Sequence, residues 1–343
     1  MFGLFSRPQA VSAQVNDTVI TVQPKETLLQ AALRQGIDFP HSCRVGGCAS
    51  CKCQLVEGRV KQLTDAGYIL SDDELDRGFI LACQSVPRTD VRIRVDLARS
   101  QSRRKVPGRV IRHEQLTHDI SHLRIQLDET LNYRGGQYAQ LSLDSLPGVS
   151  RSYSFASRSQ TDAIVNFFVR WVPDGVFTSR VQGRSLVGQG VVVEGPHGNF
   201  YLRAAEAPLL LMAGGSGLAP LLALLEDALA EGVKRPVVLM FGARTQADLY
   251  ALDAIERLRS QWPQDFTFLP ILSEEPVGSS WAGLRGLITE LIPTHAPAGC
   301  HAYLCGPPAM VDAAAAQLRQ RGVNPEHVHA DRFTTQGDVA AAA

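Results

Sequence analysis

The sequence predicts a multidomain protein in which a small mixed α/β domain precedes an antiparallel β-barrel and a doubly wound parallel sheet. Three observations predict this architecture. The chain has 343 residues, which is enough for two or three domains. Four of its seven cysteines lie within residues 43–53. After about residue 207, a run of short strands gives way to regular strand–helix alternation.

The composition is that of a globular protein without a charge bias. The chain is 45% hydrophobic and carries 34 Lys or Arg against 34 Asp or Glu. A nucleic-acid partner would need a basic face, and we find none, so no such partner is predicted. Residues 1–10 do not read as a secretory signal, and an odd number of cysteines argues against a disulfide framework. A cytoplasmic protein with reduced thiols is therefore predicted.

Residues 1–97 predict the first domain. Residues 12–22 alternate apolar and polar side chains, which indicates a hairpin. Residues 26–35 have helical spacing and are followed by Gly36, which suits a helix C-cap. Residues 53–63 predict a second hairpin.

The next segment predicts a linker and then a barrel. Residues 98–106 are polar and basic and lack apolar periodicity, which is typical of a linker. Residues 107–205 hold many short β runs separated by Gly, Pro and Asp, the pattern expected of a barrel.

Residues 206–334 predict the third domain, and residues 335–343 a disordered tail. Four strand–helix units in succession indicate a parallel sheet covered on both faces. Residues 207–225 are apolar and long enough to cross a membrane. Two prolines and three glycines interrupt this stretch, so a buried strand, a glycine turn and a helix are predicted in its place.

The cysteine spacing predicts a metal centre. The pattern is Cys43-x4-Cys48-x2-Cys51, with 31 residues between Cys51 and Cys83. This is the spacing of plant-type [2Fe–2S] sites, in which three thiolates converge from one tight loop and the fourth comes from another element.

Zinc and a Rieske cluster are the alternative centres. Structural zinc loops carry C-x2-C pairs on both sides, which this loop lacks, and a Rieske cluster needs two histidines where only His41 is close. Gly46 and Gly47 favour an iron–sulfur loop because backbone N–H groups can approach the sulfides there. Cys53, two residues after Cys51, is predicted to be a packed free thiol.

Residues 39–64 together with 81–85 resemble the plant-type ferredoxin domains fused to bacterial oxygenase reductases, which belong to the ferredoxin–NADP reductase superfamily. The resemblance implies a β-grasp fold for the first domain and a [2Fe–2S] cluster on the four cysteines of the spacing pattern. Members of this family usually have Gly after the second cysteine, where this chain has Ala49.

The stretch RSYSFAS at residues 151–157 resembles the flavin motif of the same superfamily. It implies a six-stranded antiparallel barrel that binds FAD. Arg151 would neutralise the pyrophosphate, Tyr153 would stack on the flavin ring, and Ser154 would hydrogen-bond near its reacting nitrogen. A second phosphate clamp is implied at Arg170, Gly175 and Thr178.

Residues 214–220, GGSGLAP, place three glycines between a strand and a helix. A nucleotide diphosphate fits the N-terminus of such a helix, and Pro220 suits its first position, N1. The string resembles the G-G-x-G-x-A-P motif of the superfamily and implies nicotinamide nucleotide binding at Gly214, Gly215 and Gly217.

Three later stretches complete the predicted nucleotide site. Arg244 follows the second strand and is predicted either to contact the adenosine ribose or a 2′-phosphate, or to lie solvated on the surface. No acidic residue stands at the usual strand end, so the residues alone do not separate NADH from NADPH. YLCGPPAM resembles a family motif that places Cys305 and Gly306 beside the nicotinamide, and ADRF implies Asp331 and Phe333 near the flavin.

The order of the three motif sets implies an oxidoreductase that passes electrons from NAD(P)H, with NADH preferred, through FAD and a [2Fe–2S] cluster. Tyr153, Ser154 and Cys305 are the predicted catalytic positioning residues. The implied partner is a terminal oxygenase acting on aromatic or hydrocarbon substrates, of the di-iron or Rieske type and including membrane-bound ones, or a small ferredoxin. The chain itself is predicted to be a monomer. A reductase of deoxysugar biosynthesis and a redox sensor without turnover are the alternatives.

Overall fold

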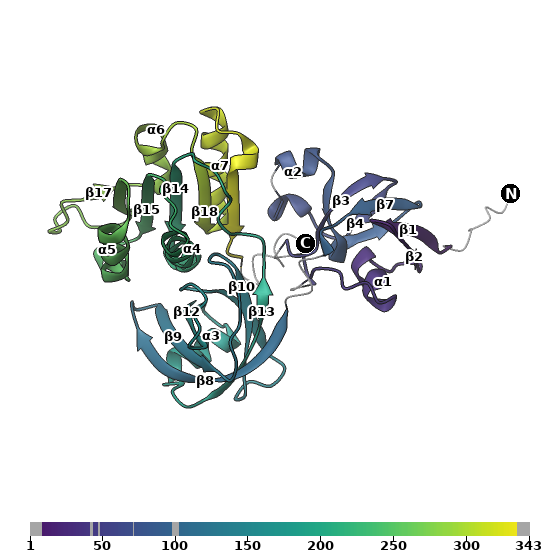
Figure 1. Cartoon of the computed structure of the whole chain (residues 1–343), viewed down its shortest axis with the longest axis horizontal. Helices are drawn as coiled ribbons and strands as arrows, with labels where there is room; N and C mark the ends of the chain where they lie inside the picture. The colour runs from purple at the N-terminus through teal and green to yellow at the C-terminus, as the bar shows by residue number, and fades with distance from the viewer. Residues whose placement is uncertain (1–8, 42–43, 47–48, 71, 98–102, 335–343) are drawn as a thin grey trace. The chain divides into compact units, whose positions relative to one another are not determined.

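A computed structural model describes residues 9–41, 44–46, 49–70, 72–97 and 103–334 of the chain. The chain divides into two compact units, one of residues 1–102 with 334–343 and the other of residues 103–333 (Figure 1).

The first unit is built on a five-stranded mixed sheet in the order β2-β1-β7-β3-β5. These strands are β1 (Val11–Val15), β2 (Thr18–Val22), β3 (Lys52–Glu57), β5 (Phe79–Leu81) and β7 (Val91–Arg94). The predicted first hairpin is confirmed, because β1 and β2 pair antiparallel. Strands β1 and β7, from opposite ends of the unit, pair in parallel near the centre of the sheet, as expected for a β-grasp fold.

Helix α1 (Leu28–Arg34) packs on this sheet and confirms the predicted helix. The Thr27 hydroxyl accepts a hydrogen bond from the Gln30 N–H, and the Gln30 side chain accepts one from the Thr27 N–H, so both ends of a capping box are present. Gly36 follows the helix at φ +80°, a conformation that glycine adopts without a steric cost.

The predicted second hairpin is wrong. Strand β4 (Val60–Gln62) follows β3 closely, but β4 pairs with β6 (Ser85–Pro87) while β3 pairs with β5 and β7. Gly58 between them lies so close to the chain entering β7 that a Cβ would stand 2.2 Å from the Asp90 carbonyl oxygen. The turn at Gly58 therefore packs against the chain entering β7, and the strands on either side of it, β3 and β4, do not pair with each other. Three short elements complete the unit: η1 (Ala66–Tyr68), α2 (Asp72–Asp76) and η2 (Ala82–Gln84).

The second unit begins with a six-stranded antiparallel sheet in the order β11-β10-β13-β8-β9-β12. A bridge between Phe155 and Phe167 joins the two ends, so the sheet curls into the predicted barrel (Figure 1). Its elements are β8 (Arg104–Gln115), β9 (Ile120–Leu127), β10 (Tyr138–Leu143), β11 (Ser150–Ser154), β12 (Ile164–Arg170), α3 (Val176–Gly183) and β13 (Gly190–His197). Strand β8 starts inside the segment predicted as a linker.

The rest of this unit is a parallel sheet in the order β17-β16-β15-β14-β18-β19. Helices α4 and α5 pack on one face, and α6 and α7 on the other, which confirms the doubly wound prediction (Figure 1). The strands are β14 (Leu209–Gly214), β15 (Val237–Ala243), β16 (Phe266–Leu272), β17 (Leu284–Arg285), β18 (His301–Gly306) and β19 (Val328–Arg332). The helices are η4 (Gly215–Gly217), α4 (Leu218–Ala230), η5 (Gln246–Asp248), α5 (Leu252–Gln261), η6 (Ile288–Leu291), α6 (Ile292–His295), α7 (Pro308–Gln320) and η7 (Pro325–His327).

The apolar window at 207–225 forms β14, the glycine turn and the first part of α4, as predicted. All six residues of β14 are buried, because the sheet is covered on both faces. Within the described part of the chain, no helix has both the length and the apolarity needed to cross a membrane.

Candidate functional site

Cys51 and Cys83 come together at the edge of the first unit. Cys51 precedes β3, Cys83 lies in η2, and both side chains are buried. The Cys83 N–H donates to the Cys51 sulfur at 3.5 Å, and the Gln84 side chain donates to the Cys83 sulfur at 3.6 Å. Donors aimed at sulfur stabilise its thiolate form, which is the form that binds metal. Cys43 and Cys48, the other two predicted ligands, lie outside the described residues.

The described part of the cysteine loop fits a plant-type [2Fe–2S] cluster. At Gly46, where φ is +85°, a Cβ would lie 3.0 Å from Cγ of Gln84 and 3.1 Å from Oγ1 of Thr64. Ala49 is also left-handed, with φ of +50°, which explains why glycine is usual at this position of the resembled family. The two left-handed residues and the donors to the sulfurs of Cys51 and Cys83 are compatible with the predicted cluster.

Cys53 differs from the two predicted ligands. It lies on β3 and is 1% exposed. Burial, with the charge of Cys83 adding to it, raises the pKa of the Cys53 thiol far above its usual range. A thiol that keeps its proton is a poor ligand, in line with the prediction of a packed free thiol.

The flavin motif lies on β11, beside β10. Arg151 and Tyr153 pair with Leu141 and Ala139, so their side chains share one face of the barrel wall, while Ser154 lies on the other face and is buried. The Tyr153 ring lies 5.4 Å from the Phe177 ring of α3. Burial raises the pKa of Tyr153 far above its usual value, so its phenol stays neutral.

Gly175 and Thr178 shape the turn that leads into α3. The Thr178 hydroxyl donates to the Val172 carbonyl at 3.1 Å and accepts from the Val172 N–H at 3.2 Å. A Cβ at Gly175 would stand 2.5 Å from this hydroxyl, so the turn admits only glycine. The hydroxyl is thus engaged with the backbone of its own turn.

Arg170 points toward the nucleotide domain. Its Nε donates to the Asp119 carboxylate at 3.1 Å, and its Nη1 lies 3.3 Å from the point where a Cβ on Gly215 would stand. The structure therefore brings Arg170 together with the glycine turn after β14. It does not show a contact between Arg170 and the Gly175–Thr178 turn.

The glycine turn of residues 214–217 packs against the start of α7 and the end of β18. A Cβ would stand 2.7 Å from the Met310 sulfur at Gly214 and 2.2 Å from the Cys305 carbonyl at Gly217. The Tyr250 hydroxyl donates to the Gly215 carbonyl at 3.0 Å and holds the left-handed turn, where φ is +54°. The bare backbone at the N-terminus of α4 is a cradle that fits a nucleotide diphosphate.

Pro220 is the third residue of α4, and the prediction that it occupies N1 is wrong, because the helix begins at Leu218. Proline is tolerated there because no N–H of the first helical turn has a partner within the helix.

Cys305, Gly306 and the residues of the last strand meet at the same end of the sheet. Cys305 lies opposite Asp331 in the pairing of β18 with β19, and the Phe333 N–H donates to the Gly306 carbonyl at 2.9 Å. Burial raises the pKa of the Cys305 thiol, with the Asp331 charge adding to it. The Cys305 thiol is therefore neutral.

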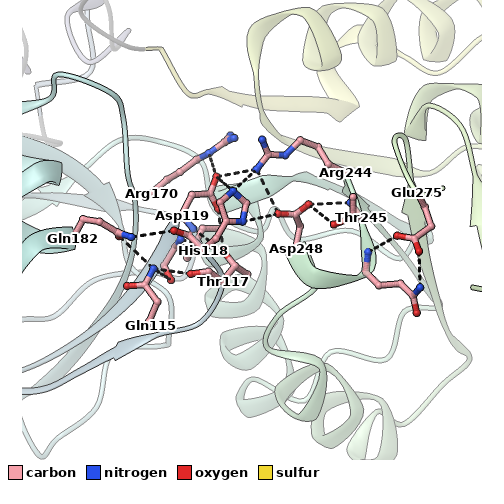
Figure 2. A network of polar contacts seen from close by, with 12 residues as sticks. Gln115, Thr117, His118, Asp119, Arg170, Gln182, Arg244, Thr245, Asp248 and Glu275 are labelled. Carbon is pink, nitrogen blue, oxygen red and sulfur yellow. Dashed lines mark hydrogen bonds and ion pairs between the residues drawn. The ribbon is translucent and has the colours of Figure 1, made fainter. Parts of the chain in front are cut away.

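Arg244 belongs to a polar network that joins the barrel to the nucleotide domain, as Figure 2 shows. Its Nη2 lies 3.2 Å from Asp119, 3.4 Å from Asp248 and 3.1 Å from Nε2 of His118. Asp119 also binds Arg170, so two carboxylates neutralise two guanidinium groups across the interface. Three side chains of the network could offer ligand atoms to a metal ion, because these atoms lie within 4.8 Å of one another; they belong to His118, Asp119 and Asp248. Both carboxylates, however, are already paired with arginine.

Neither acid of this network, Asp119 or Asp248, is among the residues predicted from the sequence. Asp248 had a signal, because Thr245 and Asp248 form a capping box in which the carboxylate accepts from the Thr245 N–H at 2.9 Å. That box fixes an acidic residue near the end of β15. No local sequence signal marks Asp119, since it contacts Arg244, which lies 125 positions later in the chain.

Comparison with known families and proteins agrees with this arrangement. Residues 13–88 match a family described as a 2Fe-2S iron–sulfur cluster binding domain, residues 107–201 an oxidoreductase FAD-binding domain, and residues 211–316 an oxidoreductase NAD-binding domain.

Two relatives and one solved structure are similar over nearly the whole chain. The xylene/toluene monooxygenase electron transfer component of Pseudomonas putida is 39% identical and covers 96% of each chain. The ferredoxin–NAD(P)+ reductase component of a naphthalene 1,2-dioxygenase system, also from Pseudomonas putida, is 34% identical over 94% of this chain and 98% of its own. The crystal structure of an Amycolatopsis cytochrome P450 reductase is 33% identical, covers 95% of this chain and 99% of its own, and has a TM-score of 0.74.

Proposed function

The chain belongs to the ferredoxin–NADP reductase family, among the oxygenase reductase components that join a 2Fe-2S domain to FAD-binding and NAD-binding domains. We propose that it uses NADH to supply a terminal oxygenase, either a hydroxylase or a dioxygenase. It is an oxidoreductase that carries electrons from NAD(P)H to a terminal oxygenase. The observation that carries this conclusion is the presence of all three binding domains, in one order, in one chain.

The cofactors divide the chemistry between them. A bound FAD would supply a group that can take up two electrons together and give them up singly, which suits a nicotinamide donor and a [2Fe–2S] acceptor. The side chains of the protein position the cofactors and take no part in proton transfer. Tyr153 and Cys305 suit this role, because burial keeps both side chains neutral.

Three groups of residues would hold the cofactors. Arg151, Tyr153 and Ser154 on β11 would hold the flavin and its pyrophosphate. The glycine turn and the N-terminus of α4 would hold the diphosphate of NADH, beside the Nη1 of Arg170, which lies next to Gly215. Cys305, Gly306, Asp331 and Phe333 would border the nicotinamide and the flavin, and Cys43, Cys48, Cys51 and Cys83 would bind the cluster.

The network of Figure 2 supports a preference for NADH over NADPH. Arg244 is the cation placed to meet a 2′-phosphate, but Asp119 and Asp248 already neutralise it. A 2′-phosphate would bring further negative charge beside two carboxylates, whereas a ribose 2′-hydroxyl can donate a hydrogen bond to Asp248.

We further propose that the partner is a terminal oxygenase of the di-iron or Rieske type, soluble or membrane-bound, and that the chain acts as a cytoplasmic monomer. Residues 1–97 carry 11 Lys or Arg and 11 Asp or Glu. A domain without net charge supports docking that depends little on salt. Because the terminal oxygenase chooses the substrate, aromatic and hydrocarbon compounds are proposed only as a class.

Steady-state reduction of ferricyanide and of cytochrome c tests the proposal. We expect rapid NADH-dependent reduction of both acceptors, with kcat/KM for NADH at least about tenfold above that for NADPH, because one unfavourable phosphate contact costs a few kcal/mol. Flavin binding without turnover would support a sensor and contradict the proposal. An equal or higher kcat/KM with NADPH would contradict the assignment of Asp119 and Asp248.

A further inference from the structure

Five basic side chains gather where the strands of the parallel sheet begin. His301 opens β18, His329 lies on β19, and His327 ends η7, while Arg203 and Arg235 precede β14 and β15. We call these five residues the basic cluster. The glycine turn lies at the other end of the same strands, and the six residues of β18 put about 17 Å between the two ends. The basic cluster is therefore separate from the nucleotide site.

The three histidines are packed against one another. The His301 and His327 rings stack with their centroids 4.0 Å apart and an angle of 24° between planes, and the His301 and His329 rings lie 6.2 Å apart. His301 is 7% exposed. Nδ1 of His301 and Nε2 of His329 are buried and have no hydrogen-bond partner within the described part of the chain.

The two arginines are bound through backbone groups. Arg235 is 3% exposed, and its Nη1 donates to the Arg203 carbonyl at 3.1 Å. Its Nη2 is buried and finds no hydrogen-bond partner in the residues that the structure describes. Arg203 donates to the Asn199 carbonyl at 2.8 Å, and its own N–H donates to the Tyr303 hydroxyl at 2.8 Å. Among the described residues, no carboxylate forms an ion pair with either arginine.

A buried guanidinium without a counter-ion is unusual, because burying a charge is costly unless it is paired. Burial lowers the pKa of Arg235, and the nearby Tyr303 and Glu206 offset only part of this effect. Burial and the charge of Arg203 lower the pKa of His329 to about 4. Burial, with smaller contributions from His327 and Arg235, also lowers the pKa of His301. His301 and His329 are thus neutral at pH 7, and the arginines supply the positive charge.

We propose that the basic cluster binds a small oxyanion of the phosphate class. Such an anion supplies acceptors for the unpartnered guanidinium N–H of Arg235 and for the imidazole nitrogens once they are protonated. Half-buried Arg203 and His327 form its exposed rim. The unpartnered atoms are buried, which favours a small ion over a docking protein surface.

A metal ion is the less suitable ligand. Three imidazoles are present, but two of them stack face to face and do not converge on one point. The charges of Arg203 and Arg235 would also repel a cation, since both lower the pKa of His329.

Anion binding should be linked to proton uptake. A bound phosphate would offset the charges of Arg203 and Arg235. The pKa values of His301 and His329 would then rise. Each histidine that becomes protonated as the pH falls would therefore make phosphate bind more tightly. Linkage allows up to about a tenfold change in affinity per pH unit for each proton taken up. We expect binding about tenfold tighter at pH 6 than at pH 8.

Inorganic phosphate and histidine NMR test the proposal on the full protein loaded with FAD and cluster. Phosphate is titrated against chloride at matched ionic strength, with labelled imidazoles observed from below pH 4 up to pH 8, so that the midpoint of His329 falls within the range. We expect phosphate, and not chloride, to raise the midpoints of His301 and His329. Arg203→Gln or His327→Gln should abolish the shift, and Arg244→Gln, in the nucleotide domain but outside the basic cluster, should retain it.

The wild-type titration alone can overturn the proposal, even if a variant fails to fold. If phosphate and chloride leave the midpoints of His301 and His329 equal, the cluster is not an oxyanion site and water satisfies its unpartnered atoms. If Arg244→Gln abolishes the effect as fully as Arg203→Gln, phosphate acts through the nucleotide site and the proposal also fails.

Discussion

The carbonyl oxygen of Cys305 lies 2.2 Å from the position that a Cβ on Gly217 would occupy. This contact joins the glycine turn to the end of β18, and thereby holds the two nucleotide motifs in one arrangement. No real side chain tolerates such a distance, so the backbone would have to move to admit even a methyl group.

Gly217→Ala should therefore damage the nucleotide site. The displaced turn would misplace both the diphosphate cradle and the nicotinamide, and an error of about 1 Å can cost a hundredfold in rate. We expect kcat/KM for NADH to fall at least about tenfold while FAD and cluster absorbance remain. Gly278→Ala, where nothing lies within 4 Å of a Cβ, is the matched control. Equal activity in the two variants would show that the contact is not needed.

The cysteines of the first unit offer a paired test. Cys83→Ser should lose most of the cluster iron and its visible absorbance, because an alkoxide replaces a thiolate poorly as an iron ligand. Cys53→Ala should keep the iron and lose only about 1–2 kcal/mol of stability, the usual cost of a small buried truncation. Iron analysis and absorbance of both purified variants decide the matter. Iron loss from Cys53→Ala with retention in Cys83→Ser would reverse the ligand assignment.

Ala49→Gly should stabilise the first unit. Ala49 has φ of +50°, where a Cβ costs roughly 1 kcal/mol, while glycine is unstrained. After allowance for the larger entropy of glycine in the unfolded chain, we expect a gain of about 0.5 kcal/mol and slower loss of cluster absorbance in denaturant.

Ala313→Gly provides the contrast for that variant. Ala313 is an exposed residue inside α7, where glycine costs about 1 kcal/mol. Destabilisation by Ala49→Gly as large as that by Ala313→Gly would mean that the loop does not store the strain its dihedral angle indicates.

Glu226 gives the interface between the barrel and α4 a defined pH dependence. Its carboxylate accepts from the Arg158 N–H at 2.8 Å, yet burial outweighs this bond and raises the pKa of Glu226. The folded state therefore holds the proton more tightly than the unfolded state. The resulting stabilisation is complete below the unfolded pKa, about 4.3, and is lost as the pH rises through the higher folded value.

Glu226→Gln should keep the hydrogen bond and remove the buried charge. We expect the melting temperature at pH 8 to rise by about 2–4 °C, which corresponds to about 1 kcal/mol, with little change at pH 4. Glu256→Gln, at an exposed helix position paired with Arg259, should show no such gain at pH 8. A lower melting temperature for Glu226→Gln at every pH would mean that the carboxylate charge itself stabilises the interface.

The sequence predicted the parts of the site that local motifs encode. RSYSFAS and GGSGLAP each place their residues through the backbone of one short segment, so their positions follow once that segment is recognised. Contacts between distant segments were missed. Asp119 reaches Arg244, and Glu226 binds the Arg158 N–H, only because the barrel and the parallel sheet pack together.

The failed hairpin has a similar cause. Residues 53–63 have the local pattern of two paired strands around Gly58, but each strand finds its partner elsewhere in the unit. Packing between distant segments decides which strands pair. The alternation of apolar and polar residues predicts a strand but does not identify its partner.

Anaerobic titration of the purified protein with NADH, followed by absorbance and EPR, tests the central claim most directly. The account predicts that flavin absorbance bleaches and that the rhombic EPR signal of a reduced [2Fe–2S] cluster grows as NADH is added. A protein that is colourless when pure, or that stays oxidised in excess NADH, would contradict it.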